Sequence, residues 1–312
     1  MACVFAYIAQ MHFHFCLATL PAMFRESVQD FVTLLASGLN DCGCQVTIDD
    51  SQVIYGGKAI NLFIEHFEGD AVGDLIATKR QKGRDFPFGI LFCENLNDTE
   101  VMSGEFAWRS DGFRRVAEVS NFVWHLMPRT EQRTDIVDPE KCSLLSLGYS
   151  ARFKNIPLQP ERDIDFYLPG LAYPRRRPIL QKLSDLGYNV RSSDLKTPAY
   201  IFRSLMGRSK AILEIGRFDN TSTPSTVRIC IGATNSIPVL AENFKGPDFD
   251  YMYDYTIAVD FDSYVGRCVD LMEREDPIAT GKALHDKFAA ERPFKAILDA
   301  LLAEKRFDPF RD

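Results

Sequence analysis

The side chains best suited to bind a ligand lie in a polar segment that leads into an apolar stretch with helical spacing. Its hydroxyls and its cation are Ser222, Thr223, Ser225, Thr226 and Arg228. Pro224 favours the start of a helix here, because proline is accepted in a first helical turn. The first amides of a helix lack intrahelical acceptors and the helix dipole is positive at that end, so we predict that this segment binds the phosphates of a nucleotide. The plainer alternative is that Thr223 only caps the helix.

A second candidate anion site follows an apolar run at 164–168. Gly170 lets the backbone approach a ligand closely, because glycine has no side chain. Arg175 and Arg176 come next, at the start of a predicted helix over 176–186, and the forked guanidinium group suits phosphate oxygens. We predict that these residues neutralise a diphosphate. The alternative is a solvated basic face, since charge runs usually face water.

Three residues are candidates for a general base, the group that would remove a proton from an attacking hydroxyl. Glu94 follows the apolar run 88–92, and ligands of open α/β sheets bind at such strand ends. His14 and Glu131 lie in predicted loops. Each of the three could instead be structural or solvated, and the sequence does not select among them.

Residues of the metal-ligating types are present, but their spacing does not form a complete site. His12, His14 and Cys16 alternate and could place three ligands on one strand face. Cys42 and Cys44 flank one glycine without a second ligand pair, whereas structural zinc takes four ligands. The Asp-x-Asp pairs, a manganese-binding pattern, begin at Asp163, Asp248 and Asp260. The first pair opens a strand, the second lies in a loop and the third precedes a helix, so we predict no metal and no cofactor.

The elements that must position these residues alternate along the chain. In the first half, apolar runs with strand character cover 2–8, 45–48, 60–64, 88–92 and 122–126. Helical spacing of apolar residues covers the stretch from Phe24 to Leu39 and a stretch from about Gly104 to Val119. Strands that alternate with helices predict βαβ units and a parallel sheet.

The same alternation restarts after 145–163, a segment with prolines and mixed charge that is typical of a linker. We place the boundary at Pro157 and predict domains over 1–157 and 158–312. Predicted strands of the second half cover 164–168, the region of Val190, 211–215, 239–241 and 256–259. Predicted helices cover 176–186, 198–206, 224–233, 263–272 and 294–302. This order predicts a second parallel sheet with right-handed crossovers.

Composition limits the class of protein. At 312 residues the chain is long enough for two domains, and 46% hydrophobic and 25% charged residues are ordinary for a globular protein. A net charge of -7 argues against a general nucleic-acid or membrane-surface binder, which needs a cationic face. The apolar N-terminus lacks a basic region, so we expect neither a signal peptide nor a membrane span. Because we expect no signal peptide, the scattered cysteines indicate reduced thiols and a cytoplasmic protein. The sequence leaves open whether the chain associates into an oligomer.

Two segments resemble the second domain of GT-B glycosyltransferases. In that family a polar loop and a helix of small residues precede a short strand of the form P-V-(I/L)-x-E, and residues 222–228 followed by IPVLAEN at 237–243 are similar to it. The opening of the second half, 163–190, resembles the family's first βα unit there. The resemblance implies that Glu242 holds the ribose or sugar of a nucleotide-sugar donor. The upstream acid of the E-x7-E pattern of retaining members is absent, because Thr234 stands in its place.

The resemblance extends diffusely over the first half, where 24–67, 121–132 and 144–153 are similar to the acceptor domain of bacterial members. It implies an α/β protein with two Rossmann-like domains whose parallel sheets face a central cleft. It also implies an enzyme that transfers a sugar from a nucleotide-sugar to an unknown acceptor without a metal. The alternative is a non-catalytic nucleotide- or sugar-binding protein on a degenerate glycosyltransferase fold. A nicotinamide oxidoreductase is not expected, because no G-x-G-x-x-G string is present.

Overall fold

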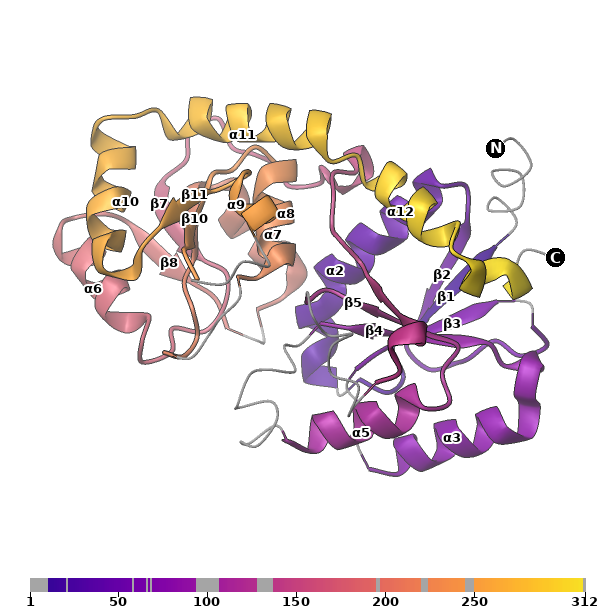
Figure 1. Cartoon of the computed structure of the whole chain (residues 1–312). Helices are drawn as coiled ribbons and strands as arrows, with labels where there is room; N and C mark the ends of the chain where they lie inside the picture. Colours follow the sequence, from indigo (N-terminus) through magenta and orange to yellow (C-terminus); the bar gives the residue numbers. More distant parts are fainter. Residues whose placement is uncertain are drawn as a thin grey trace. The chain divides into compact units, whose positions relative to one another are not determined.

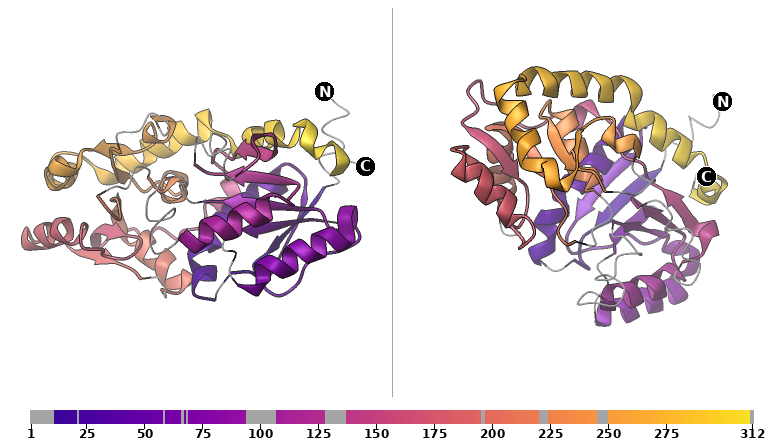
Figure 2. Two further views of the ribbon diagram at one scale, coloured as in Figure 1. Left: turned by 60° about the horizontal axis from the view of Figure 1, so that its bottom comes forward. Right: turned by 60° about the vertical axis from the view of Figure 1, so that its left-hand side comes forward.

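The chain divides into two compact units, each built on one parallel sheet with helices on its faces (Figure 1; Figure 2). The first unit comprises 1–25, 34–146 and 294–312, and the second comprises 26–33 and 147–293. The computed structural model describes residues 11–20, 22–57, 59–65, 67, 69–93, 107–127, 137–194, 197–219, 224–244 and 250–310.

The first sheet has the strand order β2-β1-β3-β4-β5-β6, and every pairing is parallel. Its strands are β1 (His12–Cys16), β2 (Gln45–Asp49), β3 (Ile60–Ile64), β4 (Phe88–Phe92), β5 (Phe122–His125) and β6 (Cys142–Leu144). Strands β3 and β4 are buried along their whole length. Continuous apolar runs are expected where helices cover both faces of a parallel sheet. The strands predicted at 45–48, 60–64, 88–92 and 122–126 are therefore confirmed.

The helices of the first unit are α3 (Asp70–Lys82), α5 (Ala107–Ala117) and α12 (Phe294–Leu302), together with the two ends of α2 (Ala22–Asp41), whose residues 26–33 group with the second unit. Helices α3 and α5 lie side by side on one face of the sheet (Figure 1). Helix α12 packs on α2 at Gly38, where an added Cβ would stand 2.4 Å from the Phe294 ring and 2.6 Å from Leu298. The absence of a side chain at Gly38 therefore lets the two helices approach closely.

The second sheet has the order β11-β10-β9-β7-β8, again with only parallel pairings. Its strands are β7 (Ile164–Leu168), β8 (Val190–Ser192), β9 (Ser209–Glu214), β10 (Val239–Glu242) and β11 (Ile257–Val259). All five correspond to predicted strands. Parallel pairing brings the carboxyl ends of these strands to one edge of the sheet, which is where the loops with the predicted site residues begin.

The helices of the second unit are α6 (Arg177–Asp185), α7 (Ala199–Gly207), α8 (Thr226–Thr234), α9 (Asp250–Tyr253), α10 (Tyr264–Glu273) and α11 (Pro277–Glu291). Apolar residues of α6 and α10 pack against one face of the sheet: Ile179, Leu183, Tyr264, Cys268 and Leu271. Helices α8 and α11 contact each other and also contact β10 and β9 respectively. The residues of this core cluster therefore all come from the second unit.

Some local predictions differ from the structure. The first described strand is β1, which falls in a predicted loop, while the strand predicted at 2–8 lies outside the described residues. Helices α3 and α11 are not among the predicted elements. Their periodic signal is short, because α3 buries Val72 and Leu75, and α11 buries Gly281, His285 and Phe288.

The compact units do not coincide with the predicted ranges 1–157 and 158–312. The main part of the second unit begins at Leu147, and residues 294–312 group with the first unit. The last helix groups with the first unit because its apolar stripe, predicted from spacing, is buried on α2. In the part of the chain that the structure describes, no helix is both long and apolar enough to cross a membrane.

Candidate functional site

The order of the second sheet changes direction at β7. Strand β8 follows β7 in sequence and pairs on one side of it, whereas β9 pairs on the other side. In open parallel α/β sheets, ligands bind at such a switch point, outside the carboxyl ends of the strands. Residues 169–176 follow β7 and residues 215–219 follow β9 at this point. The fold therefore brings the two predicted anion-binding segments to neighbouring strand ends.

Arg176 is a buried cation without an acidic partner. The residue is 7% exposed. Its Nε donates to the carbonyl oxygen of Ile215 at 2.9 Å, and its Nη1 donates to that of Leu171 at 2.9 Å. No carboxylate of the described residues forms an ion pair with it. Burial and the nearby Arg217 guanidinium lower the pKa of Arg176 to about 10, so it is charged at neutral pH. A buried charge requires compensation, and Arg176 therefore favours a bound anion.

Gly170 keeps a position beside two guanidinium groups free of a side chain. Its φ of +140° is a conformation that residues with a Cβ rarely adopt. A Cβ on Gly170 would lie 3.5 Å from Nη2 of Arg228 and 3.7 Å from Nη1 of Arg176. The backbone N–H of Gly170 donates to the Ser193 hydroxyl at 3.0 Å, which anchors the loop to the end of β8. An oxyanion at the free position would meet both guanidinium groups.

Glu214 and Arg228 form a buried ion pair at the end of β9, with side-chain exposures of 4% and 15%. Arg228 also donates from Nη2 to the carbonyl oxygen of Pro169 at 2.6 Å, which ties α8 to the loop after β7. The backbone N–H of Ser225 donates to Oε1 of Glu214 at 2.9 Å. Part of the anion-binding capacity predicted for the start of α8 is therefore used by a carboxylate of the chain itself.

Helix α8 begins at Thr226, and Ser225 is its N-cap, because the Ser225 hydroxyl accepts from the N–H of Arg228 at 3.4 Å. The alternative that Thr223 caps this helix is therefore wrong. The Thr226 hydroxyl oxygen is buried and has no hydrogen-bond partner in the described part of the chain. Leaving such a group unpaired is costly, so it favours a polar ligand atom nearby. Ser222 and Thr223 lie outside the described residues.

Arg175 and Glu242 form a bidentate ion pair. Arg175 donates from Nη1 to Oε2 of Glu242 at 2.7 Å and from Nη2 to Oε1 at 2.6 Å. Its Nε donates to Asp219 at 3.0 Å, and its guanidinium carbon lies 3.8 Å from the centroid of the Phe261 ring. Burial opposes the charge of Arg175, but the bonds to Glu242 and Asp219 outweigh it and raise its pKa. The predicted contact of Arg175 with phosphate stays a prediction and requires these bonds to open.

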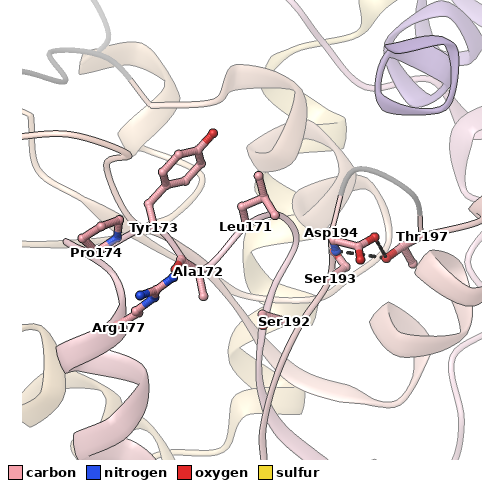
Figure 3. Close-up of a pocket in the computed structure, with 9 residues that line it drawn as sticks. All are labelled: Leu171, Ala172, Tyr173, Pro174, Arg177, Ser192, Ser193, Asp194 and Thr197. Atoms are coloured by element: carbon pink, nitrogen blue, oxygen red, sulfur yellow. Dashed lines mark hydrogen bonds between the residues drawn. The ribbon is translucent and has the colours of Figure 1, made fainter. Parts of the chain in front are cut away.

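A hollow with a volume of about 520 Å³ adjoins Arg176. Its lining residues are Leu171, Ala172, Tyr173, Pro174, Arg177, Ser192, Ser193, Asp194 and Thr197. Tyr173 and Arg177 lie on one side, and Asp194 with its hydrogen-bonded partner Thr197 lies on the other (Figure 3). Leu171 and Tyr173 also contact the Arg176 guanidinium. The hollow combines a ring, hydroxyls and a carboxylate, which suits a polar ligand with an apolar face.

The candidate base His14 lies in β1 of the first unit and is 4% exposed. Its Nδ1 is 2.8 Å from the Thr47 hydroxyl and its Nε2 is 3.0 Å from the carbonyl oxygen of Gln52. A carbonyl only accepts, so Nε2 carries the proton and Nδ1 accepts from Thr47. A role as base stays a prediction and needs one of these bonds to open. The other candidates, Glu94 and Glu131, lie outside the described residues.

The residue types that could ligate a metal are dispersed. Among the described side chains, no group of three or more His, Cys, Asp and Glu residues is placed to hold a metal ion. Asp163 and Asp165 lie at the amino end of β7, where they pair with Arg208 and Lys210. This pair therefore stands at the opposite edge of the sheet from Arg176.

Sequence analysis did not single out Glu214 or Tyr173. Glu214 carries a signal that could have revealed it, since an acid interrupts an otherwise apolar strand in AILEIG, 211–216. Acids are almost never fully buried without a partner, so this pattern predicts a nearby cation. Tyr173 carries no such signal, because aromatic residues are common in loops that cover a sheet.

No protein-family model matches the sequence, and no curated protein matches it. Among solved structures, a crystal structure of TarM is similar with a TM-score of 0.53 and 13% sequence identity, over 81% of this chain and 55% of that chain. A structure of a mutant TarM from S. aureus in complex with fondaparinux, alpha-GlcNAc-glycerol and UDP is similar with a TM-score of 0.54 and 12% identity, over 81% of this chain and 56% of that chain. The chain thus spans little more than half the length of these TarM structures.

The feature shared with these structures is the architecture of two Rossmann-like α/β units with parallel sheets. The predicted cleft between the sheets stays a prediction. The likeness and the two sheets together show that the chain has the GT-B fold of glycosyltransferases, as the resemblance in its sequence implied.

Proposed function

We propose that this chain is a glycosyltransferase that moves a sugar from a nucleotide-sugar donor to an acceptor, with the donor phosphates bound at Arg176 and Gly170. One observation carries the proposal: Arg176 is a buried guanidinium at a sheet switch point, and no described carboxylate neutralises it. The fold supports the class of reaction, because one of the similar TarM structures contains UDP.

Transfer breaks the bond between the sugar C1 and a phosphate oxygen, and the electron pair stays on the departing phosphate. The acceptor oxygen bonds to C1 and releases its proton to a base, for which Glu94, Glu131 and His14 stay the candidates. Arg176 would stabilise the negative charge that develops on the leaving phosphate, because it is fixed in place before the reaction. The reaction that we propose therefore needs no metal to stabilise this charge.

The nucleoside would occupy the hollow beside Arg176. Its volume of about 520 Å³ falls within the range of about 300 to 1,000 Å³ that is usual for small-molecule sites. Tyr173 offers a ring face, and Asp194 and Thr197 offer polar atoms for hydroxyl groups. The nucleobase and the sugar of the donor follow from the screen below.

The first test is a thermal-shift and titration screen against UDP, GDP, CDP, TDP and their sugars, because a ligand that binds the folded state raises the melting temperature. We expect one nucleotide to bind selectively. Arg176→Gln should weaken its binding by about 10- to 100-fold, the effect of losing one charged hydrogen bond of about 1.5 to 3 kcal/mol.

Arg162→Gln is the matched control. Arg162 is a partly buried guanidinium that donates to the carbonyl oxygen of Ser209 at 3.3 Å, beside the amino ends of the same strands. Its substitution should leave nucleotide affinity unchanged. If no nucleotide binds the wild-type protein, or if Arg176→Gln and Arg162→Gln bind equally well, the proposal is wrong.

The alternative is a non-catalytic nucleotide- or sugar-binding protein. The observation that favours it is that Glu214 and Glu242, two buried acids at the carboxyl ends of β9 and β10, are held in ion pairs with arginine. Slow hydrolysis of the bound donor, followed by release of free sugar, distinguishes the two functions. Tight nucleotide binding without hydrolysis or transfer to any acceptor would favour the alternative.

A further inference from the structure

The peptide group between Ile215 and Gly216 is hydrogen-bonded on both sides. Its carbonyl oxygen accepts from Nε of Arg176 at 2.9 Å. Its N–H donates to Oε2 of Glu242 at 2.8 Å. A peptide group is planar, so an acceptor that fixes its N–H also fixes the direction of its carbonyl oxygen. Glu242 therefore sets the orientation of the group that holds Arg176.

Glu242 is itself held in one orientation. The two oxygens of its carboxylate accept from the two terminal nitrogens of Arg175, a geometry that fixes both planes. Arg175 is restrained by Asp219 at 3.0 Å and by the ring of Phe261 at 3.8 Å. The contacts thus form a continuous series from Arg175 through Glu242 and one peptide group to Arg176.

Gly216 makes this arrangement possible. A Cβ at this position would lie 2.8 Å from Cε1 of Phe244, 3.0 Å from Nη1 of Arg175 and 3.2 Å from Oε2 of Glu242. Real Cβ atoms do not approach other atoms as closely as the first of these distances. The backbone can therefore reach the carboxylate only because residue 216 has no side chain.

We infer that Glu242 and Arg175 are positioning residues, which orient Arg176 toward a bound phosphate and do not contact the ligand themselves. The inference rests on the proposed function for the identity of the ligand. It replaces two earlier expectations, the predicted contact of Arg175 with phosphate and the contact of Glu242 with the ribose or sugar that the sequence resemblance implies. The three bonds that Glu242 accepts favour positioning, because each of its oxygens already has a donor.

The test compares two ligands, the nucleotide found in the screen and inorganic pyrophosphate, which has no ribose. Glu242→Gln keeps the size of the side chain but cannot accept two bonds from Arg175, since the amide nitrogen only donates. We expect both ligands to bind about tenfold more weakly, the usual size of an effect transmitted through a supporting hydrogen bond. A loss confined to the nucleotide, or no loss for either ligand, overturns the inference.

A second measurement needs no ligand. The Nε–H of Arg176 should exchange slowly with solvent, because it is bonded to the Ile215 carbonyl, and its NMR signal is identified by its absence in Arg176→Lys. Glu242→Gln and Arg175→Lys should each speed this exchange by about tenfold. Unchanged exchange in both variants overturns the inference, whether or not the wild-type protein binds a nucleotide. If the wild-type protein binds no nucleotide, the proposed function fails, and this measurement still decides the positioning role.

Glu275→Gln is the matched control for both measurements. Glu275 forms a bidentate pair with Arg267, through bonds of 2.7 and 3.1 Å, in the same unit but away from the loops that carry Arg176. The substitution therefore breaks a similar pair without touching the series of contacts at Arg176. We expect wild-type affinity for both ligands and wild-type exchange of the Arg176 Nε–H.

Discussion

The arginines at the carboxyl edge of the second sheet differ in what holds them. Arg175 and Arg228 each bind a buried carboxylate, whereas Arg176 binds carbonyl oxygens and pairs with no carboxylate among the described residues. A paired guanidinium serves mainly to stabilise the fold, since removal of one partner leaves the other charge buried and uncompensated. An unpaired guanidinium can bind a ligand without first breaking an ion pair. Arginines that lie near one another at this sheet edge therefore have different roles.

Arg228→Ala should destabilise the second unit by about 3 to 5 kcal/mol, because it leaves the Glu214 carboxylate buried without its partner. Urea unfolding followed by circular dichroism measures this change. The double variant Arg228→Met with Glu214→Gln removes both charges and should recover much of the loss. Equal unfolding free energies for wild type and Arg228→Ala would contradict the assignment. Nucleotide affinity of Arg228→Ala alone is a poor probe of the site, because the variant also changes stability.

At the scale of the elements, helix α8 packs closely against the start of the strand that follows it. A Cβ on Gly232 in α8 would lie 2.3 Å from Cγ2 of Val239 and 2.9 Å from the carbonyl oxygen of Ile237. A Cβ on Gly266, in α10, would meet no atom within 4 Å. Glycine is therefore required in α8 for packing, whereas in α10 it only weakens the helix.

The two glycines give opposite predictions for the same substitution. Gly232→Ala should destabilise the protein by about 1 to 3 kcal/mol through overpacking. Gly266→Ala should stabilise it by about 0.5 to 1 kcal/mol, because alanine is the better helix former. Thermal or urea unfolding of the two variants beside wild type measures both changes. If both substitutions change the unfolding free energy in the same direction, close packing at Gly232 does not distinguish the two positions.

At the scale of the whole molecule, the C-terminal segment 294–312, which follows the second unit in the sequence, contributes to the core of the first unit. Phe307 is fully buried, and its ring centroid lies 4.8 Å from that of Phe122 and 5.6 Å from that of Trp124. Both partners are in β5. The first unit therefore depends on residues from both ends of the sequence.

Phe307→Ala should lower the unfolding free energy of the first unit by about 3 to 5 kcal/mol, the usual effect of removing a buried ring. Tryptophan fluorescence during urea unfolding reports on this unit, because Trp108 and Trp124 both belong to it. Tyr200→Ala, at a position that is 72% exposed in the second unit, is the control and should leave the transition unchanged. Nucleotide binding by folded Phe307→Ala should match wild type. Lost binding with an unchanged tryptophan transition would contradict this division of roles.

The sequence by itself determined most strands of the two sheets, though not β1 or β6, and several residues of the candidate site. Continuous apolar runs such as 60–64 and 88–92 are long enough to form buried strands. The segments between such runs contain turn residues or apolar residues at helical spacing. Gly170 and Arg176 could be selected because a glycine turn and a basic helix start follow one of these runs. These features depend on interactions between residues that are near each other in the chain, so a short stretch of sequence is enough to predict them.

Only the tertiary structure decided which charges are neutralised. Arg175 and Glu242 are far apart in sequence, and they meet because β7, β9 and β10 are adjacent and parallel, which brings their carboxyl ends to one edge. The same order brings Arg228 to Glu214, while Arg176 meets the carbonyl oxygens of Ile215 and Leu171 and no carboxylate of the described residues. Strand order arises from the packing of the whole chain, because many pairings of similar apolar strands would satisfy the local pattern equally well.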